Sequence, residues 1–157
     1  MRKQEPIGLL VAAVRRRIKQ VVSAMVREYG LSPQQFWTLV AIARHEGISL
    51  RELSGRQRMD DPTACRIVNT LGRRRLVRNT PDPSDRRRSR LMLTPSGREM
   101  ANRLLPVATA VRTAVETGLT ARERKAVVAG LQKVVVNLDT VQMRTLKSAP
   151  RTGPEAP

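Results

Sequence analysis

The sequence predicts a mainly α-helical fold with one small β-hairpin, and three observations support this prediction. Apolar residues recur at steps of three and four along most of the chain, which is typical of helices that bury one face. Serine, threonine or aspartate stands at the start of most of these stretches, where such residues cap helices. Two short alternating runs, joined by a segment of Pro, Asp, Ser and Arg, predict the hairpin.

The first helices have boundaries that the sequence marks clearly. Gly30 ends the first apolar stripe, as glycine commonly does at a helix C-terminus. Ser32 and Gln35 then form a capping box, and Ser49 and Glu52 repeat it at the head of a short helix. The predicted helices are residues 10–29, 32–47, 50–56 and 61–72, then, after strands at 76–80 and 89–93, a helix from 94 and a last helix over 120–145.

The starts of two later helices are also marked by capping residues, and a proline lies inside a third helix. We expect Asp61 to cap the fourth helix, with Pro62 in its first position. Thr120 and Glu123 form a further capping box at the head of the last helix. Pro106 should kink or divide the helix that starts at residue 94, because proline removes a backbone donor.

The order of these elements is that of a winged helix-turn-helix domain between two sets of terminal helices. We assign residues 31–93 to the DNA-binding domain, 1–30 and 94–147 to dimerisation helices, and the Pro-rich residues 148–157 to a disordered tail. The small central domain cannot bury the apolar stripes of the terminal helices, which predicts a homodimer. The alternative is that these helices fold back on their own domain.

Charge and composition narrow the possible functions. The chain has 30 Lys and Arg against 13 Asp and Glu, a net charge of +17, which implies a polyanionic partner. The single cysteine and single histidine, Cys65 and His45, exclude an internal disulfide and the usual metal sites, so we expect no cofactor. The sequence also carries no enzyme signature, and no apolar stretch of membrane-spanning length, which places the protein in the cytoplasm.

One face of the predicted fourth helix carries side chains that suit a DNA major groove. It lies opposite a buried stripe of Ala, Ile, Val and Leu. Arginine can pair with guanine, asparagine with adenine, and threonine with thymine or phosphate. The alternative is an ordinary solvated face. The predicted contacts on this helix are Pro62, Thr63, Arg66, Asn69, Thr70 and Arg73.

The hairpin supplies a second candidate contact. Eight arginines lie between residues 73 and 90, against two aspartates. An arginine on a protruding loop can enter the minor groove, where the potential is most negative. We expect Asp85 to pair with an arginine and brace the loop; the alternative is an exposed turn aspartate. The predicted wing residues are Asp85, Arg86, Arg87 and Arg88.

The segment from Gly30 to Arg98 resembles the central domain of the multiple antibiotic resistance regulator (MarR) family of bacterial transcription factors. The most specific parts are DPSDRRR at 82–88 and LTPSG at 93–97. By this resemblance Asp85 and Arg87 correspond to the family's wing pair, with Arg87 entering the minor groove. The resemblance also implies a homodimer on a palindromic operator, commonly a repressor relieved by a ligand.

Relatives in this family bind phenolic or carboxylate effectors between the dimer helices and the DNA-binding lobe. A pocket for an aromatic acid needs apolar walls and a cation. The candidate lining residues are Arg16, Tyr29, Trp37, Arg44 and His45. Cys65 lies on the flank of the recognition helix, whereas the peroxide-sensing branch has its cysteine in the first helix, so we expect an inert Cys65.

Two other functions compete with the regulator. The diffuse positive charge allows an architectural protein that coats DNA with little sequence preference. The basic residues 15–19 allow a membrane-surface protein bound to anionic lipid.

Overall fold

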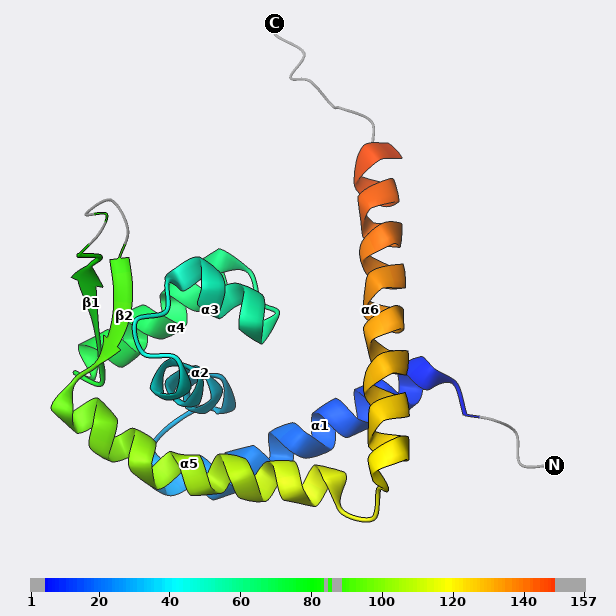
Figure 1. Ribbon diagram of the computed structural model, residues 1–157, viewed down its shortest axis with the longest axis horizontal. Coiled ribbons are helices and arrows are strands. Elements are labelled where there is room, and N and C mark those ends of the chain that lie inside the picture. Colours follow the sequence, from blue (N-terminus) through cyan, green and yellow to red (C-terminus); the bar gives the residue numbers. More distant parts are fainter. Residues whose placement is uncertain (1–4, 84, 86–88, 149–157) are drawn as a thin grey trace, which may run out of the picture. The chain divides into compact units, whose positions relative to one another are not determined.

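A computed structural model describes residues 5–83, 85 and 89–148 (Figure 1). Six α-helices, a short 3₁₀ helix and a two-stranded antiparallel sheet occur in these residues, which confirms the predicted fold class. The elements are α1 (Ile7–Val26), η1 (Arg27–Tyr29), α2 (Pro33–Arg44), α3 (Leu50–Gln57), α4 (Asp61–Arg73), β1 (Val77–Pro81), β2 (Ser89–Leu93), α5 (Pro95–Glu116) and α6 (Ala121–Ser148). The chain divides into two compact units, residues 1–115 and 116–157.

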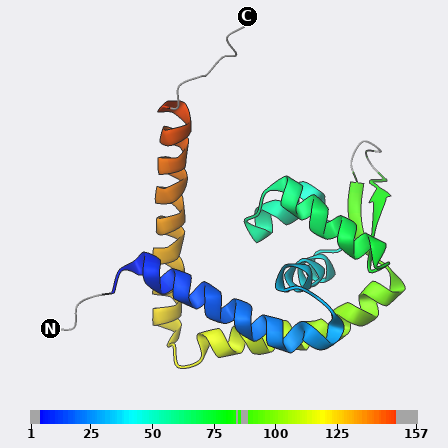
Figure 2. The same ribbon diagram turned by 180° about the vertical axis from the view of Figure 1, so that it is seen from behind.

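The first unit has one aliphatic core to which every helix from α1 to α5 contributes. The two views of the ribbon show α1 and α5 on the same side of α2, and residues of both helices belong to that core (Figures 1 and 2). Its largest fully buried side chains are Val22, Val26, Phe36, Thr38, Leu39, Ile42, Leu53, Leu71, Leu91 and Leu104. This core fixes the positions of α3 and α4, which carry the candidate DNA-binding face.

The start of α4 differs from the prediction by one residue. Asp60, not Asp61, is the N-cap, and its carboxylate accepts a hydrogen bond from the backbone N–H of Thr63 at 2.7 Å. Pro62 therefore occupies the second helical position, where its missing N–H is tolerated because the first turn has no backbone partners. The capping boxes at Ser32 and Ser49 are confirmed.

α5 runs through Pro106 as one helix, so of the two effects predicted for this proline, a kink or a division, the division does not occur. Proline removes the hydrogen bond to the carbonyl four residues earlier, at Asn102. Both Pro106 and Asn102 are exposed, so water can replace the lost bond.

The hairpin pairs Val77 with Leu93 at its base and Pro81 with Ser89 at its far end, so β1 begins one residue later than predicted. On its other edge β2 bonds to the segment between α2 and α3. The N–H of Leu91 donates to the carbonyl of Ile48, and the N–H of Gly47 donates to the carbonyl of Leu91, both at 2.9 Å. β2 is therefore the central strand of a small three-stranded arrangement.

The second unit consists mainly of α6. The predicted capping box is confirmed, because the Thr120 N–H donates to Glu123 at 2.8 Å and the Glu123 N–H donates to Thr120 Oγ1 at 3.2 Å. Large apolar side chains along this helix are exposed in the single chain: Val127, Val128, Leu131, Val136, Leu138 and Val141. In the first unit, the beginning of α1 exposes a similar set: Ile7, Leu9, Leu10, Val11 and Val14.

None of the helices in the described residues is both long enough and apolar enough to cross a membrane.

Candidate nucleic-acid interface

The first residues of α4 are bonded to α3, and α3 is in turn bonded to α2. The buried Ser54 of α3 donates its hydroxyl hydrogen to the carboxylate of Asp61. Gln57, the last residue of α3, donates from Nε2 to the backbone carbonyl of Trp37 in α2 at 2.8 Å. The N-terminus of α4 is therefore fixed on the domain by side-chain hydrogen bonds as well as by apolar packing.

The exposed and buried faces of α4 are those that the sequence predicted. Ala64, Ile67 and Leu71 are buried, whereas Arg66 and Asn69 are exposed. Pro62 and Arg73, at the two ends of the same face, are also exposed. The face that could enter a major groove is therefore open to solvent.

Thr63 and Thr70 lie at the edge of this face and are half-buried. The hydroxyl of Thr63 donates to Asp60 Oδ2 at 3.0 Å, and that of Thr70 donates to the carbonyl of Arg66 at 2.9 Å. Arg73 Nη2 donates to Thr70 Oγ1 at 3.3 Å. Both hydroxyl hydrogens are thus used within the helix, which leaves the hydroxyl oxygens as acceptors and the two methyl groups for contacts with DNA.

Cys65 lies at the flank of this face. Its thiol is exposed, and Asn69 Nδ2 lies 3.5 Å from Sγ. The spacing of four residues between Cys65 and Asn69 already places both on one side of a helix, so the sequence contained this signal.

Arg74 has a structural role that the sequence did not reveal. Its Nη1 donates to the carbonyl of Gly30 at 2.7 Å and its Nη2 to the carbonyl of Tyr29 at 3.0 Å. These carbonyls end η1, where a cation also interacts well with the helix dipole. Arg74 therefore joins the C-terminus of α4 to the end of the first helix. We no longer count it among the arginines between residues 73 and 90 that are candidates for DNA contacts.

Replacing Arg74 with alanine should lower the melting temperature by about 3–6 °C, because two charge-assisted hydrogen bonds are lost at a junction of two helices. Differential scanning calorimetry measures this change. Arg75→Gln removes the same charge from an exposed neighbour and serves as the control. Equal melting temperatures for the two variants would contradict the structural role of Arg74.

In the wing, the structure shows an ion pair that the sequence did not predict. Arg90 Nε donates to Asp82 Oδ2 at 2.7 Å, and Asp82 is buried. Thr80 pairs with Arg90 in the ladder, so a residue two positions beyond Thr80 lies diagonally within reach of Arg90. Asp82 therefore braces the hairpin.

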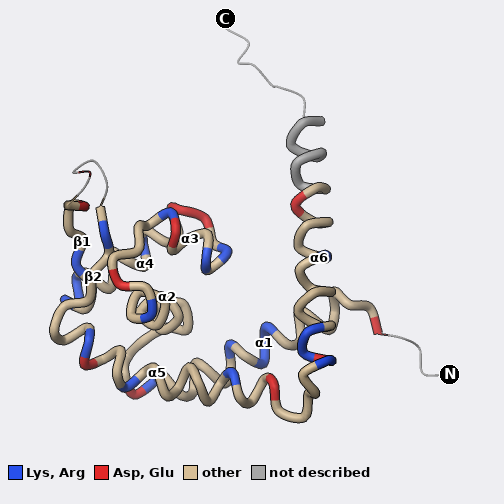
Figure 3. The backbone as a smooth tube through the Cα atoms, viewed as in Figure 1, with Lys and Arg blue, Asp and Glu red and all other residues tan. Residues whose placement is uncertain are grey.

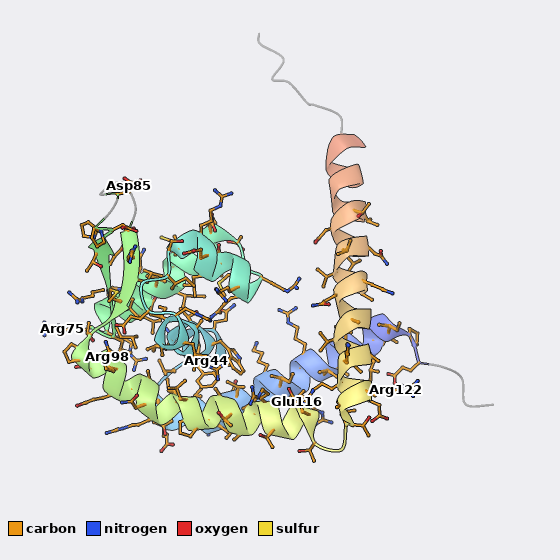
Figure 4. The ribbon with its side chains drawn as sticks, in the orientation of Figure 1. Arg44, Arg75, Asp85, Arg98, Glu116 and Arg122 are labelled. Atoms are coloured by element: carbon orange, nitrogen blue, oxygen red, sulfur yellow. The ribbon has the colours of Figure 1, made fainter. Side chains whose placement is uncertain are left out.

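Asp85 lies at the tip of the hairpin and is exposed (Figure 4). Arg86, Arg87 and Arg88 lie outside the described residues, so the predicted wing contacts remain predictions. The blue segments of the backbone in Figure 3 mark Lys and Arg positions on β1 and β2 below the tip, as well as on α1, α3 and α4. The two strands contribute Arg78 and Arg90, and Arg90 is paired with Asp82.

Glu46 and Arg98 join the loop after α2 to the beginning of α5. Arg98 donates to both carboxylate oxygens of Glu46, at 2.8 and 2.9 Å, and the N–H of Leu93 donates to Oε1 at 3.2 Å. The hydrogen bond from Arg98, helped by that from Leu93, holds the pKa of Glu46 below its ordinary value. The carboxylate thus supports the base of the hairpin from one side.

The lowered pKa of Glu46 predicts a pH-dependent contribution to stability. The contribution should be complete above the ordinary pKa of glutamate and disappear as the pH falls through the lowered value. At pH 7 we expect Glu46→Gln to melt about 2–4 °C below the wild type, a modest effect because the pair is partly exposed. Thermal melts from pH 7 to pH 3.5 should show this difference shrinking, and a difference that stays constant would contradict the role of the ion pair.

A cleft of about 740 Å³ opens between α1, α2 and the turn from α3 to α4. Of the predicted effector residues, Trp37, Arg44 and His45 line it. Arg16 does not, because one residue along a helix turns the side chain by about 100°; Arg15 lines the cleft instead. Tyr29 also lies elsewhere, half-buried against the core, and this burial raises the pKa of its hydroxyl.

The cleft combines apolar walls with arginines. Trp37, Val40, Ala41 and Met59 supply the apolar surface. Four arginines line it: Arg15, Arg44, Arg56 and Arg58. Arg56 and Arg58 were missed because they come from α3 and its C-cap, which only the tertiary fold brings to α2. Arg56 Nη1 lies 3.4 Å from Nε2 of His45. Such a lining can hold a small organic anion with an apolar ring.

Within the described part of the chain, no group of three or more His, Cys, Asp or Glu side chains could hold a metal ion.

Comparisons with known proteins agree with this geometry. Residues 29–88 match the MarR family model. The HTH-type transcriptional repressor NicR of Pseudomonas putida is 31% identical over 131 residues, which are 83% of each chain.

Two solved structures are also similar. The first concerns regulation of DNA binding of Bordetella bronchiseptica BpsR by 6-hydroxynicotinic acid; it is 27% identical, with a TM-score of 0.71 over 83% of this chain and 94% of that one. The second is a MarR family regulator from Listeria monocytogenes in complex with a 26mer DNA. It has a TM-score of 0.77 over 96% of this chain and all of that one, and at 20% identity it shows the fold alone.

Proposed function

Because the chain belongs to the MarR family of winged-helix transcriptional regulators, we propose that it acts as a homodimeric repressor of a palindromic operator, relieved by a small aromatic acid. The relatives it matches are transcriptional regulators rather than enzymes. The observation that carries the proposal is the open face of α4, where Arg66, Asn69 and Arg73 are exposed. The DNA partner also sets the compartment that we propose, the cytoplasm.

The dimer is supported by the apolar side chains that the single chain leaves exposed at the beginning of α1 and along α6. Monomeric proteins rarely expose apolar stripes of this kind, and a two-fold dimer is the commonest way to cover them. Two copies of α4 related by a two-fold axis would read an inverted repeat, which is why we propose a palindromic operator.

The effector is supported by the cleft and by two relatives. A cleft lined by Trp37 and by four arginines suits an aromatic carboxylate. NicR is named as a repressor, and the BpsR structure concerns regulation by 6-hydroxynicotinic acid. We extend both properties to this chain as parts of the proposal.

Selection of bound fragments from the protein's own genome, at physiological salt, tests the DNA half of the proposal. We expect an inverted repeat that is bound on the order of a thousandfold more tightly than scrambled DNA. Comparable binding to the selected repeat and to scrambled DNA would overturn the proposal of a sequence-specific regulator. It would favour the architectural alternative, which the net charge of +17 supports.

A further inference from the structure

The cleft extends to the start of the candidate DNA-binding helix, where one residue caps that helix. Asp60 lines the cleft and is also the N-cap of α4. Its Oδ1 accepts the backbone N–H of Thr63 at 2.7 Å, and its Oδ2 accepts the hydroxyl of Thr63 at 3.0 Å. Thr63 itself also lines the cleft. The first turn of α4 is thus ordered by a carboxylate that stands in the wall of the cleft.

Asp60 is also the only acidic residue among those that line the cleft within the described part of the chain, where it is accompanied by four arginines. The hydrogen bonds from Thr63 hold the pKa of Asp60 below its ordinary value, so its side chain is ionised at neutral pH. An organic anion that enters the cleft therefore meets one fixed negative charge. Like charges at short range disfavour each other, and both compete for the same arginines.

We propose that Asp60 is the residue through which an anion in the cleft weakens DNA binding. The anion and the Asp60 carboxylate repel each other, and the repulsion opposes the cap that orders the first turn of α4. That turn positions Pro62, Thr63 and Arg66, which are candidate DNA contacts. DNA binding requires the ordered turn, so the anion binds the DNA-free protein more tightly than the DNA complex. This inference rests on the proposed function, since it explains how an effector would act.

The test removes the charge of Asp60 but keeps its cap. Asn caps helices about as well as Asp, so Asp60→Asn should preserve α4. Asp61→Asn is the matched control, because it removes one negative charge from the same turn at a residue that does not line the cleft, while the amide oxygen of the new asparagine can still accept the hydroxyl of Ser54. The probes are 6-hydroxynicotinate and benzoate, with neutral benzamide as the uncharged comparison. Trp37, the only tryptophan of the chain, lines the cleft and reports probe binding by its fluorescence.

Fluorescence anisotropy with the selected operator gives the DNA affinity. For the wild type and Asp61→Asn, we expect a saturating anionic probe to weaken DNA binding about tenfold, within the usual range of allosteric coupling. For Asp60→Asn, we expect less than about a twofold change, although the probe binds at least as tightly. Benzamide should leave the DNA affinity of all three proteins unchanged.

The outcomes separate the two proposals. A full response in Asp60→Asn would overturn the role of Asp60 and leave the proposed function intact. A wild type that binds the operator but responds to no anionic probe would overturn both this inference and the effector half of the proposed function. If circular dichroism shows that Asp60→Asn has lost helix, Asp60→Ser provides a second uncharged cap, and the same expectations apply to it.

Discussion

Gly97→Ala is expected to lower the melting temperature of the protein by about 6–12 °C. A Cβ atom at Gly97 would lie 1.8 Å from the carbonyl oxygen of Leu76 and 2.8 Å from its carbonyl carbon. Both are backbone atoms, so no side chain can move aside. The same carbonyl accepts the N–H of Thr94 at 3.1 Å, which ties the beginning of α5 to the beginning of the hairpin. Separating these segments should cost about 3 kcal/mol.

Gly55→Ala is the control for this experiment. Gly55 lies inside α3, and a Cβ there meets no atom within 4 Å. Alanine should raise the stability slightly, because it favours a helix by up to about 1 kcal/mol over glycine. Thermal melts of the two variants give the comparison. Similar melting temperatures would show that the close approach at Gly97 is absent in solution.

Arg66→Ala should weaken binding to the selected operator by about 10- to 100-fold, because one bidentate contact to a base contributes roughly 1–3 kcal/mol of discrimination. Arg66 is exposed in the middle of the α4 face, where a base-reading side chain would stand. Binding to scrambled DNA should fall only a few-fold, through the loss of one positive charge. Anisotropy titrations on both DNAs, at two salt concentrations, measure the two effects.

Arg112→Ala provides the matched control for Arg66→Ala. Arg112 is an exposed residue of α5, away from the helix-turn-helix, and the variant removes the same charge. This variant should weaken binding to the operator and to scrambled DNA equally, and only slightly. If Arg66→Ala also weakened binding to the two DNAs equally, Arg66 would contact phosphates rather than bases.

The sequence predicted those parts of the fold that depend on neighbouring residues. The capping boxes at Ser32, Ser49 and Thr120 need only residues three positions apart, and all three are confirmed. The buried and exposed faces of α4 follow from helical periodicity alone. Where two adjacent residues compete for one task, as Asp60 and Asp61 do for the N-cap, local chemistry is nearly equal and the sequence could not decide.

The parts that the sequence missed depend on partners that are distant in the chain. Three consecutive arginines follow Gly72, and only the fold shows that Arg74 reaches the carbonyl of Gly30. The cleft likewise combines α1 with the end of α3, so neither Arg15 nor Arg58 could be assigned to it from spacing. The run from Leu93 to Gly97 was identified by resemblance. Its physical basis, the passage of a backbone carbonyl beside Gly97, is visible only in three dimensions.

The pairing of β2 on both edges has a consequence for motion. Leu91 bonds to the Gly47–Ile48 segment on one edge of β2, and its neighbours Arg90 and Met92 pair with Thr80 and Arg78 of β1 on the other edge. β2 therefore cannot separate from β1 without remaining bound to the loop that follows α2. The amide of Leu91 should therefore exchange with deuterium only when the whole domain unfolds, in the slowest cooperative unit of the protein. The strand that supports the wing then behaves as part of the rigid core, so a change in the angle of the hairpin base requires the entire DNA-binding lobe to turn with it.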